Sequence, residues 1–335
     1  MSASPRYLLL SVLVFPVAAD AGIDFTLFHK LAPSVVKIEA HGNGKTAVGS
    51  GVMVAPEAIV TNCHVTRDAQ RIDIVKAGAT YQVRAQKSDL KHDVCVLLVP
   101  TANLPVVEIS RAKPRVGQQV IAMGYEGGLG PRFTGGEVKA LYDFDGGAVI
   151  QSTASFQSGA SGGGLFDGDG KLIGLISFKN RQRASYHFSL PVDWIYQSLD
   201  NGAAREIAPL PAGTPFWQQS PPEQPYFLRA AALESEEKWH ELLRLTKDWT
   251  TSEKSNANAW LMLGHAYFNL HQDNSAIDAY HQAVDLSREY PEAWYALGAS
   301  YLRNGQKNKA QEAYGILAGL DQNLAEQFSR NFLQQ

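Results

Sequence analysis

The chain has 335 residues, which is too long for one ordinary hydrophobic core and fits two folded units with connecting segments. An apolar fraction of 45% and a charged fraction of 19% are typical of globular protein and exclude wholesale disorder. The formal net charge is −3, and lysine and arginine form no block, so nothing in the composition indicates a nucleic-acid surface or a polybasic membrane anchor.

The first residues have the order of a signal peptide. Arg6 precedes an apolar run over 7–17, and small residues follow as far as Ala21. The run is about half as long as a membrane span needs. We therefore expect residues 1–21 to be cleaved on export to the periplasm or the extracellular space, which leaves no stable membrane anchor. A buried N-terminal helix is the alternative.

Residues 22–200 contain short apolar runs that are separated by Gly, Pro, Asn and Asp. Many of the runs are rich in β-branched residues, and their number and spacing predict an all-β barrel or sandwich. The main runs lie at 34–40, 51–54, 71–75, 94–99, 119–123, 148–151 and 172–178.

Composition changes abruptly at 201–225, where prolines concentrate. Such a segment predicts a semi-rigid, extended linker. The prolines are Pro209, Pro211, Pro215, Pro221, Pro222 and Pro225.

Beyond the linker, identical residues recur at an offset of 34 and indicate paired helices. Large residues fill the gap between the helices, and Gly and Ala allow a close crossing. The period and residues resemble tetratricopeptide repeats, which predicts an all-α domain at 226–335. We expect a degenerate repeat at 226–256, repeats at 257–290 and 291–324, and a cap helix to 335. A chance amphipathic bundle is the alternative. The pairs are Trp260/Trp294, Leu263/Leu297, Gly264/Gly298, Tyr267/Tyr301, Ala276/Ala310 and Tyr280/Tyr314.

Three segments of the β-rich region carry side chains that together support nucleophilic catalysis. His64 ends an expected strand, Asp93 opens the run at 94–99, and Ser161 lies in the glycine-rich stretch 158–164. A serine hydroxyl needs a base within hydrogen-bond reach, and that base needs an orienting carboxylate. The sequence therefore predicts a His64-Asp93-Ser161 triad.

The same segments resemble the trypsin-like serine proteases, and most closely their bacterial high-temperature-requirement (HtrA or Deg) type. The resemblance implies a chymotrypsin-like fold of two six-stranded β-barrels with the active site between them. It also implies that this chain is a serine endopeptidase. The matching segments are G-S-G-V-M-V at 49–54, T-N-C-H-V at 61–65, D-V-C-V-L-L at 93–98 and G-A-S-G-G-G-L at 159–165.

By this resemblance each catalytic role falls on one residue. His64 is the general base, Asp93 orients it, Ser161 is the nucleophile, and the amides of Gly159 and Ser161 form the oxyanion hole. Ala160 departs from the family, which has Asn at this position. Helical repeats also follow where the family usually has a PDZ module.

Two cysteines flank the expected base and its orienting acid. Cys63 precedes His64, and Cys95 lies two residues after Asp93 on the same strand face. An assembled triad would bring them together, so we expect a Cys63–Cys95 disulfide that braces the pair. Two buried free thiols are the alternative.

By analogy with the family, we expect segments near Ser161 to line the pocket that selects the substrate side chain. No acidic residue stands near Ser155, so small or medium apolar side chains are the expected substrates. Substrate main chain should pair with the strand edge at 177–179. The expected substrate-binding residues are Ser155, Phe156, Ser177, Phe178 and Phe188.

Other interpretations are weaker. The spacing Gly159-x-Ser161-x-Gly163 also fits an α/β-hydrolase elbow, but a strand, not a helix, is predicted to follow it. No zinc-type motif occurs, so we expect no metal and no cofactor. A binding protein that has lost catalysis, and a latent protease switched by a partner of the repeats through the segment 125–133, both remain open. The expected partners are protein or peptide substrates and an unidentified protein in the repeat groove.

Overall fold

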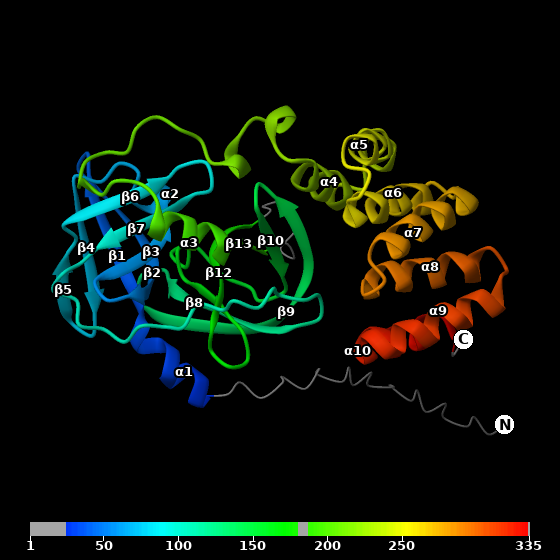
Figure 1. Ribbon diagram of the computed structural model, residues 1–335, viewed down its shortest axis with the longest axis horizontal. Coiled ribbons are helices and arrows are strands. Elements are labelled where there is room, and N and C mark those ends of the chain that lie inside the picture. Colours follow the sequence, from blue (N-terminus) through cyan, green and yellow to red (C-terminus); the bar gives the residue numbers. More distant parts are fainter. Residues whose placement is uncertain (1–24, 180–186, 334–335) are drawn as a thin grey trace, which may run out of the picture.

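The architecture is given by a computed structural model, which describes residues 25–179 and 187–333. The expected signal peptide, residues 1–21, lies outside these residues. A β-rich part occupies one end of the molecule and a stack of helices the other (Figure 1). The segment 201–225 passes over the β-rich part before it reaches the helices.

The first sheet is curled and follows a short helix, α1 (Phe25–Leu31), and a turn, η1 (Ala32–Ser34). Within the described residues it has eight strands in the order β14-β6-β7-β3-β2-β1-β4-β5. It differs from the expected six-stranded barrel: the sheet is curled and not closed, seven of its strands come from residues 35–98, and β14, from the segment expected to be a linker, joins the edge beside β6. Its strands are β1 (Val35–Gly42), β2 (Lys45–Ala55), β3 (Ala58–Asn62), β4 (Arg71–Lys76), β5 (Ala79–Gln82), β6 (Ala85–Asp89), β7 (Val94–Leu98) and β14 (Arg205–Glu206), with α2 (Cys63–Thr66) directly after β3.

The second sheet closes into a barrel, as expected. Its strand order is β10-β13-β12-β11-β8-β9. The segment 125–133, which the latent-protease alternative treats as a loop, is the paired end of the β8–β9 hairpin, with Tyr125 opposite Pro131. The strands are β8 (Gln119–Glu126), β9 (Gly130–Phe144), β10 (Gly147–Ser152), β11 (Gly164–Phe166), β12 (Leu172–Lys179) and β13 (His187–Pro191), and α3 (Val192–Asp200) follows.

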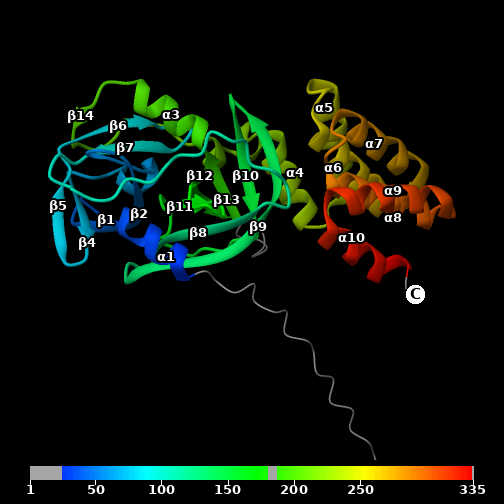
Figure 2. The same cartoon turned by 60° about the horizontal axis from the view of Figure 1, so that its bottom comes forward.

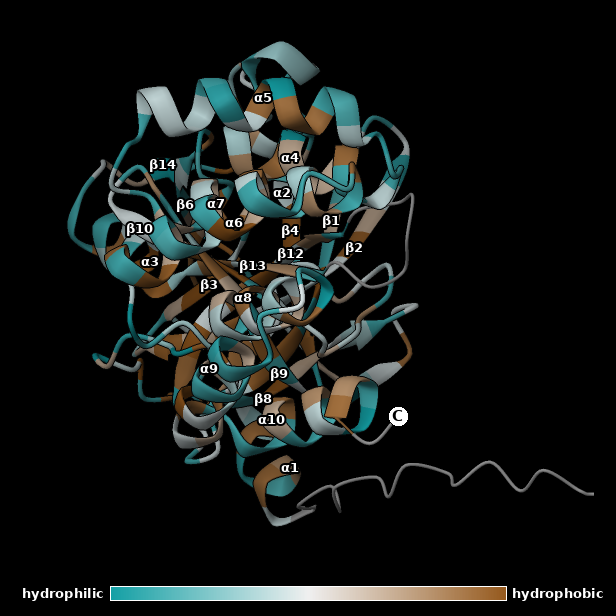
Figure 3. Cartoon of the chain, turned by 90° about the vertical axis from the view of Figure 1, so that its right-hand side faces the viewer, coloured by the Kyte–Doolittle hydropathy of each residue, from teal (hydrophilic) through white to brown (hydrophobic). Residues whose placement is uncertain are grey.

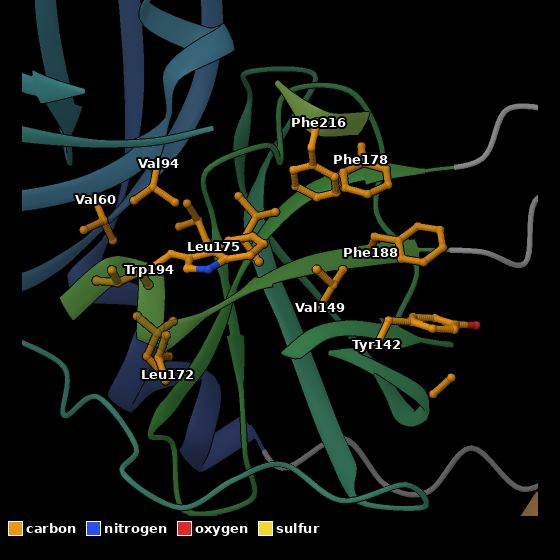
Figure 4. Close-up of a cluster of buried hydrophobic side chains, with 14 of the residues drawn as sticks. Val60, Val94, Tyr142, Val149, Leu172, Leu175, Phe178, Phe188, Trp194 and Phe216 are labelled. Atoms are coloured by element: carbon orange, nitrogen blue, oxygen red, sulfur yellow. The ribbon is translucent and has the colours of Figure 1, made fainter. Parts of the chain in front are cut away.

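The main hydrophobic core lies where the two sheets meet. Val60 and Val94 of the first sheet face Leu175 and Trp194 of the second part (Figure 4). All four side chains are fully buried. Burial of this kind is the dominant favourable term in folding, so the two sheets pack as one unit.

The segment 201–225 is bound along the β-rich part rather than extended freely. The amide of Leu210 donates to the carbonyl of Arg67 (2.8 Å), and that of Phe216 to the carbonyl of Lys91 (3.0 Å). Phe216 is 1% exposed and packs among aromatic residues of the core. Burial of this large apolar ring explains why the proline-rich segment stays in place. Two turns, η2 (Phe216–Gln218) and η3 (Pro221–Glu223), end it.

Antiparallel helix pairs form the remainder of the chain, as the repeat period predicts. Gly264 permits the expected close crossing, because a Cβ there would lie 2.3 Å from the ring of Tyr280. The elements are α4 (Tyr226–Ser235), α5 (Trp239–Ser252), α6 (Ala257–Asn269), α7 (Asp273–Leu286), α8 (Pro291–Arg303), α9 (Lys307–Leu320), α10 (Gln322–Phe328) and the terminal turn η4 (Ser329–Leu333). Figure 3 shows both hydrophilic and hydrophobic residues on α5, an outer helix of the helical part.

The helical part packs on the second barrel. Phe227 of α4 stacks on Tyr142 of β9 with ring centroids 4.7 Å apart, and Asn258 of α6 donates to the carbonyl of Leu141 at 2.7 Å. Figure 2 shows α4 beside the β9 and β10 end of the barrel. The described residues include no helix with both the length and the apolar content to cross a bilayer.

Candidate active site

His64 and Asp93 meet at the end of the first sheet. β3 pairs with β7, which sets the start of α2 beside the residue before β7. The ring Nδ1 of His64 lies 2.7 Å from Oδ2 of Asp93, and the His64 amide donates to Oδ1 at 2.8 Å. Asp93 is 1% exposed, whereas the His64 side chain is 23% exposed. The imidazole is therefore partly accessible to solvent, whereas the carboxylate that it contacts is not.

The backbone of Asp93 takes part in the same arrangement. Its φ is +61°, in the left-handed region that aspartate tolerates better than most residues. Its carbonyl accepts hydrogen bonds from the amide of Cys63 (3.2 Å) and from Nδ2 of Asn62 (3.1 Å). The T-N-C-H segment is thus attached to Asp93 by both backbone and side chains.

A disulfide joins Cys63 to Cys95, which confirms the expected pairing. The Cα atoms are 4.9 Å apart across β3 and β7. Because Cys63 adjoins His64 and Cys95 lies on the Asp93 strand, the bond covalently braces the base against its orienting acid.

Ser161 lies in a turn that only glycine can build. Gly162 has φ +85°, and a Cβ there would lie 2.2 Å from the carbonyl oxygen of Ser50. At Gly163 a Cβ would lie 2.2 Å from the carbonyl oxygen of Met123. The Ser161 hydroxyl donates to the carbonyl of Ser177 at 3.1 Å. Among the described residues no hydrogen bond joins Oγ of Ser161 to His64, and in proteins without bound substrate such bonds are often long or misaligned.

The amides expected to form the oxyanion hole are those of Gly159 and Ser161. Neither donates a hydrogen bond to any residue that the structure describes. Gly159 has φ +96° and lies against Tyr125 and Gly127 of the β8–β9 hairpin, where a side chain would collide with backbone. Unused amides beside a nucleophile are what an oxyanion hole needs.

Ser50 is a site residue that the sequence analysis did not single out. Its Oγ donates to the carbonyl of Gly159 (2.7 Å) and accepts from the amide of Tyr125 (2.8 Å). Its own amide donates to the carbonyl of Ser161 at 2.8 Å. Its place in the G-S-G motif was the available signal. The first sheet thereby holds the nucleophile turn of the second barrel.

Ser177 also has a second function beyond the expected one. Its Oγ donates to Oδ2 of Asp93 at 3.2 Å, and the residue is 3% exposed. Its carbonyl meets Ser161, so one residue of β12 touches both ends of the triad.

The other expected substrate-binding residues are distributed around the nucleophile. Ser155 is exposed, Phe156 is buried against the ring of His187 (4.9 Å between centroids), and Phe178 stacks on Phe188 at 4.9 Å. Phe188 is 1% exposed and belongs to the aromatic core. The substrate-binding roles stay predictions.

Buried polar atoms lie on one face of β10 and β13. Nδ1 of His187 and Oγ of Ser152 and Ser189 have no hydrogen-bond partner among the residues that the structure describes. Ser152 pairs with His187 in register, and Ser189 lies two residues along the same strand, so all three share a face. Burial lowers the pKa of His187, and the charge of Lys179 lowers it further.

His92, which directly precedes Asp93, is 8% exposed. It lies between Asp89 (2.6 Å) and Asp145 (2.9 Å) and stacks on Trp194. Burial opposes its charged form, but the two carboxylates outweigh burial and raise its pKa. Asp89 is thus bonded to His92, which leaves Asp93 as the carboxylate on His64.

Trp217 is a neighbour of the triad that no sequence pattern indicated. Its indole Nε1 donates to Oδ2 of Asp93 at 3.2 Å. Its ring meets that of His64 edge-on (5.5 Å, 82°) and stacks on Phe178 (4.9 Å, 11°). A tryptophan in a proline-rich stretch gives no sequence signal for such a contact. Among the described residues, no three His, Cys, Asp or Glu side chains form a group that could hold a metal ion.

Comparison with known proteins places both parts of the chain. Residues 49–175 match the model of the trypsin-like peptidase domain, 264–305 that of the TPR repeat, and 291–323 that of the tetratricopeptide repeat. Human serine protease HTRA4 is 34% identical over 204 residues, which are 55% of this chain and 42% of that protein. A probable periplasmic serine endoprotease, DegP-like, from Halomonas elongata is 31% identical over 165 residues, 46% of this chain and 35% of that protein.

Solved structures agree on the fold. The Rv3671c protease of M. tuberculosis in its active form has a TM-score of 0.52 at 23% identity and covers 64% of this chain and 98% of its own. The HtrA-type protease AlgWS227A with a tripeptide has a TM-score of 0.50 at 25% identity, over 53% of this chain and 63% of its own. The match to HTRA4 spans less than half of that relative's length. This chain contains a trypsin-like peptidase domain of the HtrA/DegP type, followed by tetratricopeptide repeats.

Proposed function

We propose that this protein is a serine endopeptidase that uses Ser161, His64 and Asp93. The observation that carries the proposal is the hydrogen bond between the buried Asp93 carboxylate and His64. It is supported by the glycine turn of Ser161, where two amides donate to no described residue. Kinship with HtrA-type serine proteases supports the same reaction.

The mechanism follows from these positions. Oγ of Ser161 leaves the carbonyl of Ser177, passes its proton to Nε2 of His64 and attacks the peptide carbonyl. The amides of Gly159 and Ser161 stabilise the oxyanion, and His64 then protonates the leaving amine. Water repeats the sequence on the acyl-enzyme. Asp93 holds the imidazole tautomer and stabilises its charged form throughout.

The repeats support a second function, the binding of a protein or peptide partner, because stacked helix pairs present a concave surface and carry no chemistry of their own. Export to the periplasm or the extracellular space belongs to the same proposal. The disulfide supports it, since such bonds persist in oxidising compartments.

A latent form is the alternative that a specific observation favours. The hydroxyl of Ser161 is bonded to Ser177 and not to His64, which is an arrangement that a partner of the repeats could change. In that case hydrolysis would begin only when the partner is added.

Hydrolysis of unfolded casein by the full chain tests the proposal, with the Ser161→Ala variant as the control. We expect new peptides in mass spectrometry from the wild type alone. Peptides produced equally by both proteins, or by neither under any condition tested, would contradict it.

A further inference from the structure

Trp217 belongs to a segment that the fold holds firmly against the triad. The preceding Phe216 is buried in the aromatic core, and its amide donates to the carbonyl of Lys91, two residues before Asp93. On the other side, Nε2 of Gln224 donates to the carbonyls of Trp217 (3.0 Å) and Gln219 (3.1 Å). The backbone around the indole is therefore fixed at both ends.

The indole contributes to an unusually complete set of donors on Asp93. Oδ2 accepts from Nδ1 of His64, from Oγ of Ser177 and from Nε1 of Trp217, while Oδ1 accepts from the His64 amide. Each carboxylate oxygen offers about two acceptor sites, so the three donors on Oδ2 fill its capacity. A buried anion with donors from several directions cannot rotate without losing one of them.

The ring of Trp217 restricts the imidazole as well. It stands edge-on to His64 at 82° and lies flat on Phe178, which adjoins Ser177 on β12. The indole thus touches the acid, the base and the strand that carries the nucleophile's hydrogen-bond partner.

We propose that Trp217 is a positioning residue of this active site, one that the segment before the repeats supplies to the peptidase domain. Its N–H fixes the plane of the Asp93 carboxylate, and its ring holds the imidazole of His64 in line for Ser161. The proposal rests on the proposed peptidase function.

The same segment links the positioning residue to the repeats. Phe216 packs against Phe227 of α4 with ring centroids 6.4 Å apart, and it also meets Phe178 at 5.8 Å. Figure 4 shows Phe216 beside Phe178. A displacement of α4 therefore reaches Trp217 through one aromatic contact and one peptide bond.

Trp217→Phe tests the proposal, because it keeps an aromatic ring and removes the N–H. The matched control is Trp260→Phe, which removes an indole N–H bonded to the carbonyl of Lys254 in the repeats. The rate of fluorophosphonate labelling of both variants is measured over a range of probe concentrations. This gives separately the labelling rate at saturation and the apparent affinity for the probe. A hydrogen bond to a charged group is worth about 1.5–3 kcal/mol, so we expect a rate about tenfold lower or more for Trp217→Phe, with little change in affinity. Trp260→Phe should match the wild type.

A spectroscopic readout keeps this test separate from catalysis. The proton between Nδ1 of His64 and Oδ2 of Asp93 gives a low-field ¹H resonance, which should shift or broaden in Trp217→Phe and not in Trp260→Phe. Gln224→Ala, which loosens the turn without touching Asp93, should lower the labelling rate in the same direction by a smaller factor.

The outcomes separate the two levels of the argument. An unchanged resonance with an unchanged labelling rate overturns the positioning function. A labelling rate that rises in Trp217→Phe also overturns it, because the ring would then be a cover over the cleft. If the wild type is not labelled but the resonance shifts in Trp217→Phe, the contact of Trp217 with Asp93 is supported. The peptidase function is then contradicted.

Discussion

The two halves of the candidate triad are held in different ways. His64 and Asp93 lie on one sheet and are joined by two hydrogen bonds and braced by a disulfide between their neighbours. Ser161 comes from the other barrel and is held by a glycine turn, and its hydroxyl is bonded to Ser177. The comparison teaches that the base and its acid are already bonded to each other without substrate, whereas the hydroxyl of the nucleophile is bonded to Ser177.

The largest effect should come from the nucleophile's turn. In Gly162→Ala the new Cβ would meet the Ser50 carbonyl oxygen at 2.2 Å and Oγ1 of Thr61 at 2.3 Å, at a φ of +85°. Misplacement of a reacting group by about 1 Å costs on the order of 10²-fold, so we expect at least that loss of fluorophosphonate labelling. Gly168→Ala, in a β11–β12 turn where the Cβ would meet nothing within 4 Å, is the control and should label normally. Equal labelling of the two variants would show that the turn does not need glycine.

Loss of the disulfide, which braces the His64–Asp93 pair, should lower the free energy of unfolding. The bond closes a loop of sequence separation 32, for which chain entropy gives about 3–4 kcal/mol. Cys63→Ala with Cys95→Ala should lower the free energy of unfolding in urea by that amount. A much smaller change would mean that hydrogen bonds alone hold the His64–Asp93 pair.

Ser50→Ala breaks the connection between the halves at one point. The buried hydroxyl bridges Gly159 and Tyr125, and its loss leaves both groups unpaired, which costs about 1–3 kcal/mol. We expect a lower free energy of unfolding in urea. We also expect the folded protein to be labelled about tenfold more slowly. If stability falls but the labelling rate of the folded fraction does not, Ser50 supports the fold and not the oxyanion turn.

The smallest effect concerns Lys76, which connects the first sheet to the second barrel. Its ammonium donates to the carbonyl of Val35 (2.7 Å) in the first sheet and to the hydroxyl of Tyr125 (3.3 Å) in the second. Burial lowers the pKa of Lys76 from 10.5 to about 8. Between these values the unfolded chain binds more protons than the folded one, so this group raises stability as pH increases from about 8 to 10.5.

Urea unfolding of the wild type and of Lys76→Met at pH 7.5 and pH 10 measures that contribution. The wild type should gain stability relative to the variant at the higher pH. A difference that is independent of pH would mean that the ammonium is as well solvated in the folded protein as in the unfolded chain.

The sequence predicts the site where the chemistry is local and fails where the contact is long-range. The repeats follow from their period, the closed barrel from the resemblance to the trypsin-like proteases, and the disulfide from the expected contact between His64 and Asp93. Trp217 does not, because its partner lies 124 residues away and its own neighbourhood is rich in proline. The same holds for β14, whose two residues carry no strand pattern and pair with β6 only because the segment is bound at Phe216.

The hairpin at 125–133 shows a different limit of sequence patterns. Its glycines are compatible with a loop, yet the segments on either side of Gly127 and Gly128 pair in register from Glu126 outward. Glycine with positive φ serves the turn itself, at φ +60° and +72°. Sequence patterns alone do not separate a tight turn from a mobile loop, since both use glycine.

Fluorophosphonate labelling of the full chain beside Ser161→Ala and His64→Ala tests the central claim most directly. The account predicts stoichiometric labelling of the wild type, with the modified peptide carrying Ser161, and no labelling of either variant. A folded wild type that resists the probe, alone and with candidate ligands of the repeats, would contradict it.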